Sequence, residues 1–166
     1  MNENHRLIEH FYQCFQQKDY CGMAACYHSE ASFSDAAFDL KTTAEIAAMW
    51  HYLCVAGKDL DIEFNAVQAG EQSGSAHWEA RYTFSRTGRK VHNIIEAQFL
   101  FRDGKIIRHT DIFSFWRWSR MALGPAGYLL GWSAFLQNKV RATAMHGLRQ
   151  FIGQHPEYQT PGPETV

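Results

Sequence analysis

The sequence predicts an α+β fold in which helices lie on one face of a curved antiparallel sheet. Apolar residues recur at helical spacing up to residue 54, whereas from residue 60 they alternate with polar residues, as in strands. Two tight-turn signals, Thr87-Gly88 and Asp103-Gly104, separate the last three strand segments, so these strands are adjacent and antiparallel. Helices first and strands afterwards indicate segregated elements rather than an alternating βαβ order.

Three helices are expected in the N-terminal part of the chain. Asp19 can cap a short second helix that continues to Tyr27, and Thr42 with Glu45 forms a capping box at the start of the third helix. A brief strand fits residues 31–35, between these two helices. The first helix, residues 4–17, has its apolar face at Leu7, Ile8, Phe11, Tyr12 and Phe15.

Four strands and one further helix are expected after residue 60. The strand segments are residues 60–68, 75–86, 89–101 and 105–116, and helical spacing returns over 134–152. The expected organisation is a domain of residues 1–118, a C-terminal helical extension of residues 119–155 packed on the same domain, and a flexible tail of residues 156–166.

The composition is that of one globular domain with uneven charge. The 166 residues are 46% hydrophobic, 20% charged and 14% aromatic, which excludes a disordered chain. The formal net charge of −1 gives no indication of nucleic-acid binding. Residues 112–156 nevertheless contain five Lys or Arg and no Asp or Glu, whereas residues 1–111 are acidic.

Targeting signals are not evident in the sequence. The first residues, MNENHRLIEHF, lack the apolar core of a secretory signal, and the four cysteines form no CxxC pair, so we expect reduced thiols in the cytoplasm. Residues 121–138 are uncharged, but three glycines and Pro125 interrupt them. We therefore expect a loop that enters a helix there, not a membrane span.

The last predicted strand carries an anomaly. Because side chains alternate between the faces of a strand, His109 and Asp111 share a face with Phe113 and Phe115. Desolvation raises the pKa of a carboxyl group in such apolar surroundings, which makes Asp111 a candidate acid/base. The alternative is a solvated Asp111 on the sheet rim, paired with a nearby arginine.

Asp35, directly after the brief strand, is the second candidate carboxylate. The alternative for Asp35 is a loop residue that caps its own turn before Phe38. His109 and Asp111 have the chemistry of metal ligands, but the spacing indicates no third ligand, so no metal is expected.

Four segments of the chain carry a family resemblance. They are FYxxFxxxD in the first helix, YHSEASFSD, the MW at the end of the third helix, and FLFRDGKIIRHTDIFSFW in the last hairpin. Together, over about residues 5–118, they resemble the nuclear transport factor 2-like superfamily. The most similar branch is the SnoaL-like group of polyketide cyclases, ketosteroid isomerases and limonene epoxide hydrolases. The resemblance implies a cone, in which a curved sheet wraps around the helices and encloses an apolar pocket.

The resemblance also implies site residues. Asp35 matches the general-base Asp of the isomerases, and Asp111 matches an acid/base Asp on the last strand of the cyclases, so both are expected to be catalytic. Other family groups are missing: Phe11 and Ala97 occupy the isomerase oxyanion positions, and Trp78 takes the place of a hydrolase Arg. The expected ligand-binding residues are Phe11, Phe15, Trp50, Trp78, Tyr82, Asn93, Ala97, Phe99, His109 and Phe113.

The resemblance and these residues predict an acid/base enzyme without a cofactor. Its ligand is expected to be small, apolar and carbonyl-containing, and the reaction an isomerisation, a cyclase-type lyase step or a hydrolysis. The alternative is a non-catalytic ligand-binding module or dimeric scaffold. We expect a homodimer in the cytoplasm and no nucleic-acid partner.

The basic region of residues 112–156 has two interpretations. Trp116, Trp118, Tyr128 and Trp132 lie among its cations, a composition typical of segments that bind a membrane interface or a partner. The acidic body, however, supplies complementary charge in the same chain. We therefore favour a helix packed over the body and do not expect binding to a membrane surface.

Overall fold

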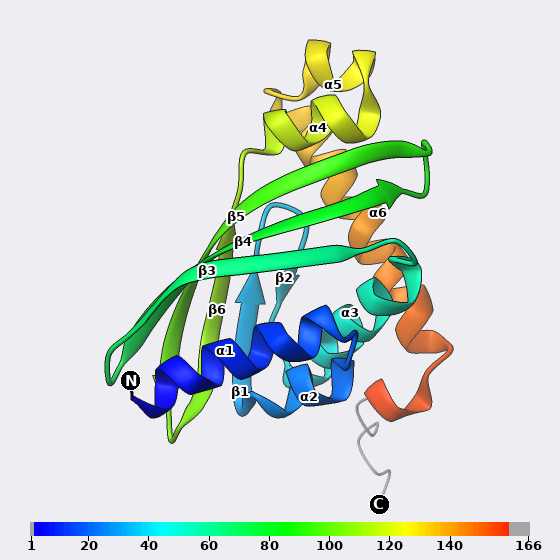
Figure 1. Ribbon diagram of the computed structural model, residues 1–166. Helices are drawn as coiled ribbons and strands as arrows, with labels where there is room; N and C mark the ends of the chain where they lie inside the picture. The colour runs from blue at the N-terminus through cyan, green and yellow to red at the C-terminus, as the bar shows by residue number, and fades with distance from the viewer. Residues whose placement is uncertain (1, 160–166) are drawn as a thin grey trace, which may run out of the picture.

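The computed structural model describes residues 2–159 and confirms the α+β architecture around a six-stranded sheet (Figure 1). The strand order is β2-β1-β6-β5-β4-β3, and neighbours are antiparallel except β1 and β6, which run parallel. The strands are β1 (Tyr27–Ser34), β2 (Asp39–Leu40), β3 (Asp61–Ala69), β4 (Ser73–Phe84), β5 (Arg89–Arg102) and β6 (Lys105–Ile112).

Helices precede and follow the four consecutive antiparallel strands β3 to β6. They are α1 (Glu3–Gln16), α2 (Tyr20–Ala25), α3 (Thr43–Ala56), α4 (Phe115–Leu123), α5 (Pro125–Leu130) and α6 (Ala134–Gly153), followed by a short 3-10 helix, η1 (Pro156–Tyr158). Local chemistry sets the starts of α2 and α3: the Asp19 side chain accepts from the Gly22 amide, and Thr42 with Glu45 forms the expected capping box.

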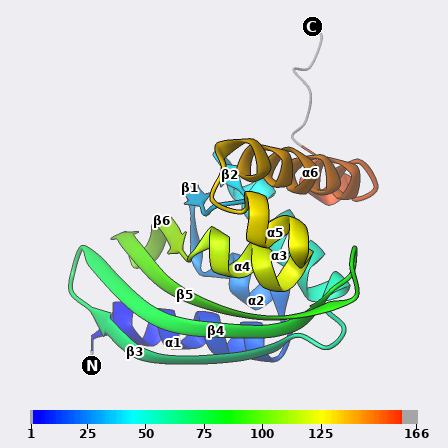
Figure 2. The same cartoon turned by 90° about the horizontal axis from the view of Figure 1, so that it is seen from above.

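The core lies inside the curve of the sheet. In Figure 2, the long strands β3, β4 and β5 form a curved wall, and α6 lies across the opposite side of the molecule. Alternation along β5 decides which residues face inward: Val91, Asn93, Ile95, Ala97 and Phe99 are buried, and the residues between them are more exposed. This inward face, with α1 and α3, surrounds the space that holds the candidate site.

Two boundaries differ from the sequence prediction. The helix expected to continue to Tyr27 ends at Ala25, and Tyr27 instead begins β1, which is therefore longer than the segment 31–35. The last strand ends at Ile112, because the Ser114 side chain accepts from the Arg117 amide and starts α4. Phe115 consequently lies in a helix, and α4 and α5 occupy most of the segment expected to be a loop.

The end of the described chain is ordered by contacts with α3. Tyr158, in the segment expected to be a flexible tail, places its hydroxyl 3.0 Å from Nδ1 of His51. The rest of that tail, residues 160–166, lies outside the described residues. Among the helices of residues 2–159, none is both long and apolar enough to cross a bilayer.

Helices α4 and α5 cross at Gly127, where the absence of a side chain is required. A Cβ atom at this position would collide with the backbone carbonyl of Ser119. We expect Gly127→Ala to lower the free energy of unfolding by about 1–3 kcal/mol, because the two helices must separate. Urea denaturation measures this change.

Gly153→Ala is the matched control for that variant. A Cβ atom at Gly153, the last residue of α6, would meet no atom within 4 Å. The control is expected to be neutral or to stabilise the protein by up to about 1 kcal/mol, since Ala favours the helix over Gly. Equal stability of the two variants would contradict the close crossing.

Candidate functional site

The curved sheet and the helices enclose a cavity of about 420 Å³. Its walls are mostly apolar and aromatic, with α3 and the sheet on one side and α4 and α6 on the other. Two carboxyl groups, Asp35 and Asp111, line this same cavity. A concave apolar pocket with a few converging polar groups is the usual form of a small-molecule site.

A chain of buried hydrogen bonds holds Asp111 in place. Trp50 Nε1 donates to the hydroxyl of Tyr27 (3.1 Å), and that hydroxyl lies 2.7 Å from Nδ1 of His109. His109 Nε2 lies 3.0 Å from Oδ1 of Asp111, which also accepts from Trp78 Nε1 (3.2 Å). His109 is fully buried, so its ring acts on the cavity only through Asp111.

The direction of the protons along this chain follows from its ends. An indole N–H can only donate, and an ionised carboxylate can only accept. With a neutral His109 between these two ends, the Tyr27 oxygen accepts from Trp50 and donates its own proton to His109 Nδ1. His109 therefore carries its proton on Nε2 and donates it to Asp111. Oδ1 of Asp111 is thus occupied twice, whereas Oδ2 forms no hydrogen bond within residues 2–159 and is available to a ligand.

Asp35 lines the cavity and comes directly after β1. Its Oδ1 accepts from the amides of Ala37 and Phe38, both at 2.7 Å, so it caps its own turn and faces the cavity at once. Burial raises the pKa of Asp35 to about 7, and the charge of Asp111 acts in the same direction. The two backbone donors and Arg141 act against this rise. Asp35 can therefore both give and take a proton near neutral pH.

Two neutral polar groups face the same space. The Tyr82 hydroxyl accepts from Trp118 Nε1 (2.9 Å), which leaves its own proton free for a ligand. Burial raises the pKa of Tyr82, so the hydroxyl stays protonated at neutral pH. The side-chain amide of Asn93 is buried and lines the cavity, and this group forms no hydrogen bond with the described part of the chain.

The structure divides the residues expected to bind a ligand into two groups. Phe15, Trp50, Trp78, Tyr82, Asn93 and Phe113 line the cavity with both aspartates. Phe11, Ala97, Phe99 and His109 do not: each is at most 1% exposed and lies in the core behind the cavity wall. Phe11 and Phe99 pack against the His109 ring, with centroids 5.6 and 4.4 Å from it, so they hold the hydrogen-bond chain and do not face the ligand.

Several residues of the site escaped the sequence prediction. Tyr27 was placed at the end of a helix, and only the parallel pairing of β1 with β6 brings it to His109. Leu136, Lys139 and Val140 of α6 also line the cavity, although the resemblance ended at residue 118. The helical spacing of the apolar residues Leu136 and Val140 was visible in the sequence, but the surface that α6 covers was not.

Potential metal ligands gather elsewhere in the described chain. Ligand atoms of His51, His155 and Glu157 lie within 4.8 Å of one another. None of these residues lines the cavity, and His109 and Asp111 gain no third ligand group there.

The raised pKa of Asp35 predicts a pH-dependent stability. The folded protein binds this proton more tightly than the unfolded chain, whose Asp has a pKa of about 3.8, so the free energy of unfolding falls as pH rises from about 4 to 7. Asp35→Asn removes this decrease in the free energy of unfolding, because an amide does not ionise, and it keeps an oxygen acceptor for the turn. We expect this variant to exceed the wild type by about 2–4 kcal/mol at pH 8 and by little at pH 4.

Urea denaturation across this pH range measures the effect. Asp39→Asn, which removes an exposed carboxylate on β2, is the matched control, and the contribution of Asp35 is the difference between the two variants. Parallel stability curves for Asp35→Asn and the wild type would contradict the burial of this carboxyl group.

Solved structures of other proteins share this fold. A protein of Catenulispora acidiphila with a ketosteroid isomerase-like fold, in complex with trimethylamine, has a TM-score of 0.64 at 7% identity, over 74% of this chain and 95% of that one. A proposed polyketide cyclase of Xanthomonas campestris pv. campestris has a TM-score of 0.61 at 16% identity, over 72% and 96%. An epoxide hydrolase of M. tuberculosis, like limonene epoxide hydrolase, has a TM-score of 0.58 at 16% identity, over 81% and 95%.

At these identities the similarity is one of fold alone. No curated protein matches the chain in sequence. The profile of the SnoaL-like domain, however, matches residues 8–109, which span α1 to β6 and include Asp35 and His109. The chain therefore belongs to the SnoaL-like family.

Proposed function

We propose that this protein is a cofactor-independent enzyme that moves protons on a small apolar ligand with a carbonyl group. The observation that supports this most is the placement of Asp35 and Asp111 on one apolar cavity, with Asp111 fixed by a buried hydrogen-bond chain. Its relatives in fold include proteins described as a cyclase and a hydrolase, which is consistent with acid/base chemistry.

In the proposed reaction, the free Oδ2 of Asp111 takes a proton from the carbon next to the ligand carbonyl. The electron pair of that C–H bond moves into the carbonyl, and negative charge develops on its oxygen. Tyr82 and Asn93 are the neutral donors that line the cavity, and they stabilise this oxygen. Asp35 in its protonated form returns a proton to a different carbon of the delocalised ligand, which completes an isomerisation and leaves Asp111 protonated and Asp35 ionised.

Asp111→Asn tests the base directly. Because an amide cannot accept the proton, we expect the variant to lose about 10²–10⁴-fold in rate while it remains folded. The assay follows exchange of α-protons for deuterium in apolar cyclic ketones by NMR, so it needs no knowledge of the natural substrate. Binding of the same ketones is followed through the fluorescence of Trp50, Trp78 and Trp118 in the cavity wall.

The outcomes separate catalysis from simple binding. Retained exchange in Asp111→Asn would remove Asp111 from the chemistry. Ketones that bind the wild type without any enzyme-dependent exchange would overturn the enzymatic proposal and favour a ligand-binding module. Phe113→Leu, a change in the cavity wall, is the matched control, and it should alter ketone affinity more than the exchange rate of the bound ketone.

Tyr27→Phe tests the positioning of Asp111 from behind. The variant leaves Trp50 Nε1 without its acceptor and His109 Nδ1 without its donor, so the ring is no longer held with its proton on Nε2. We expect the exchange rate of bound ketone to fall about 10–100-fold with affinity unchanged, because Tyr27 does not line the cavity. A loss confined to affinity would contradict a positioning role.

A further inference from the structure

The basic region of residues 112–156, called the basic extension here, exposes a concentrated group of large apolar side chains. Six lie within residues 116–135, on α4, on α5, in the link that follows α5 and at the start of α6. We call them the apolar tip: Trp116, Tyr128, Leu129, Leu130, Trp132 and Phe135. Leu129, Trp132 and Phe135 are 72%, 73% and 71% exposed. Other exposed large apolar residues of the described chain lie on α3, β5 and β6, and none is more than 57% exposed. Figure 1 shows α4 and α5 projecting beyond the strands.

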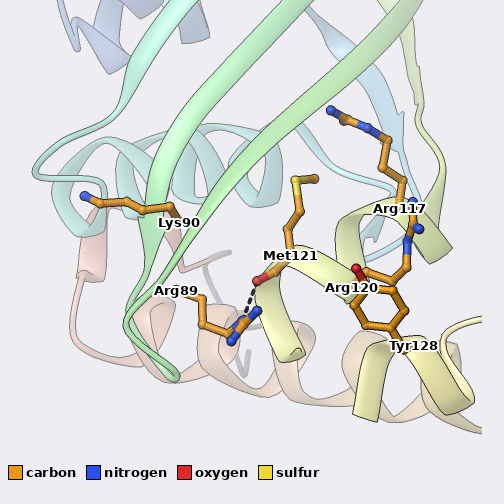
Figure 3. A pocket seen from close by; sticks show the side chains of 6 residues that line it. All are labelled: Arg89, Lys90, Arg117, Arg120, Met121 and Tyr128. Carbon is orange, nitrogen blue, oxygen red and sulfur yellow. Dashed lines mark hydrogen bonds between the residues drawn. The ribbon is translucent and has the colours of Figure 1, made fainter. Parts of the chain in front are cut away.

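A basic cavity opens beside the apolar tip (Figure 3). It has a volume of about 510 Å³ and is lined by Arg89, Lys90, Arg117, Arg120, Met121 and Tyr128, so it contains four cations and no carboxylate. Tyr128 belongs to both features, which makes the two surfaces continuous.

The arginines of this cavity are held by neutral groups. Arg89 Nε donates to the carbonyl of Met121 (2.8 Å), as Figure 3 shows. Arg117 donates to the carbonyl of His92 (2.6 Å). The Arg120 guanidinium lies over the rings of Trp116 and Tyr128, 3.8 and 5.3 Å from their centroids. These partners orient the side chains without neutralising their charge.

Within residues 2–159, no ion pair joins the basic extension to the acidic body. Complementary charge in the body was the reason for not expecting the extension to bind a membrane surface. Among residues 2–159, none of the ion pairs includes any of the five cations of the extension: Arg117, Arg120, Lys139, Arg141 and Arg149. In the basic cavity, only Lys90 is paired, with Asp59 of the body. The Nε atom of Arg120 is buried without a hydrogen-bond partner in the described chain.

We propose that the apolar tip and the basic cavity together dock on an anionic lipid surface. Trp132, Phe135 and Leu129 enter the interface between headgroups and acyl chains, and the basic cavity binds a lipid phosphate. Exposed Trp and Phe side chains flanked by Arg and Lys are the combination that binds at such interfaces. Positive charge that the chain leaves unpaired provides the electrostatic complement to anionic headgroups.

The proposal is independent of the proposed enzyme function, because the tip residues that it uses lie outside the apolar cavity. Neither Trp132 nor Phe135 lines that cavity, whereas Leu136 and Lys139, on the next part of α6, do. Docking through the tip would place the apolar cavity close to the lipid surface without blocking its walls.

Vesicle flotation with the full chain tests the docking. We expect the protein to float with vesicles of phosphatidylcholine mixed with phosphatidylglycerol, and not with vesicles of phosphatidylcholine alone. Binding should weaken as NaCl is raised, because salt screens the attraction between the cations and the headgroups. A wild-type protein that does not float with anionic vesicles overturns the proposal.

Two pairs of variants localise the binding surface. Trp132→Ser with Phe135→Ser should lower the vesicle partition coefficient at least about tenfold, because two apolar side chains no longer enter the interface. Leu100→Ser with Ile112→Ser, on strands β5 and β6, is the matched control and should bind like the wild type. Equal loss in both pairs, or no loss in the first pair, contradicts docking through the tip.

Separate measurements test the contribution of the cavity arginines to vesicle binding and the possibility that a second copy of the chain covers the apolar tip. Arg89→Gln with Arg117→Gln should lower binding severalfold and reduce its dependence on NaCl, and the exposed Arg108→Gln should change neither.

Light scattering tests a second copy of the chain as the occupant. If Trp132→Ser with Phe135→Ser converts a dimer into a monomer, and the wild type ignores anionic vesicles, the tip is a protein interface and the lipid proposal is wrong.

Discussion

The hydrogen bond between His109 and Asp111 is the interaction on which the candidate site depends. Both groups are buried, and a buried carboxylate or imidazole without partners would cost several kcal/mol. The chain meets this cost by bringing Trp50 from α3, Tyr27 from β1 and Trp78 from β4 to one line of donors and acceptors. The same hydrogen bonds that satisfy the buried polar groups also connect α3 to the sheet. Formation of the folded core therefore fixes the orientation of the Asp111 carboxylate.

Much of the fold was predictable from local patterns, because those patterns act over short distances. The capping box at Thr42 and the turn at Asp103-Gly104 each involve neighbours in sequence, and alternation along β5 identified its inward face. The parallel pairing of β1 with β6 joins segments that are more than seventy residues apart. No local pattern encodes such a pairing, so Tyr27 was missed. Phe115 was assigned to the wrong element because a single hydroxyl, that of Ser114, starts a helix there.

The site was predicted in part for the same reason. Strand alternation placed Asp111 and Asn93 on the inward face, where both line the cavity. It also placed Ala97 and Phe99 there. The inward-facing residues of one strand, however, lie partly in the cavity wall and partly in the closed core behind it. That division depends on the curvature of the sheet, which twelve- and fourteen-residue strands accumulate along their length. Net charge was informative only in part, because opposite net charges in two segments do not require ion pairs between them.

The wall that α6 contributes to the apolar cavity is distant in sequence from the residues that hold the two carboxyl groups. Asp35 and the support for Asp111 come from the segment shared with the SnoaL-like family, whereas Leu136, Lys139 and Val140 lie more than twenty residues beyond it. Substitutions in α6 can therefore reshape the space around a ligand without moving a proton donor or acceptor. Under the proposed function, α6 is therefore the part of the cavity wall in which substitutions would change ligand preference while both carboxyl groups stay in place.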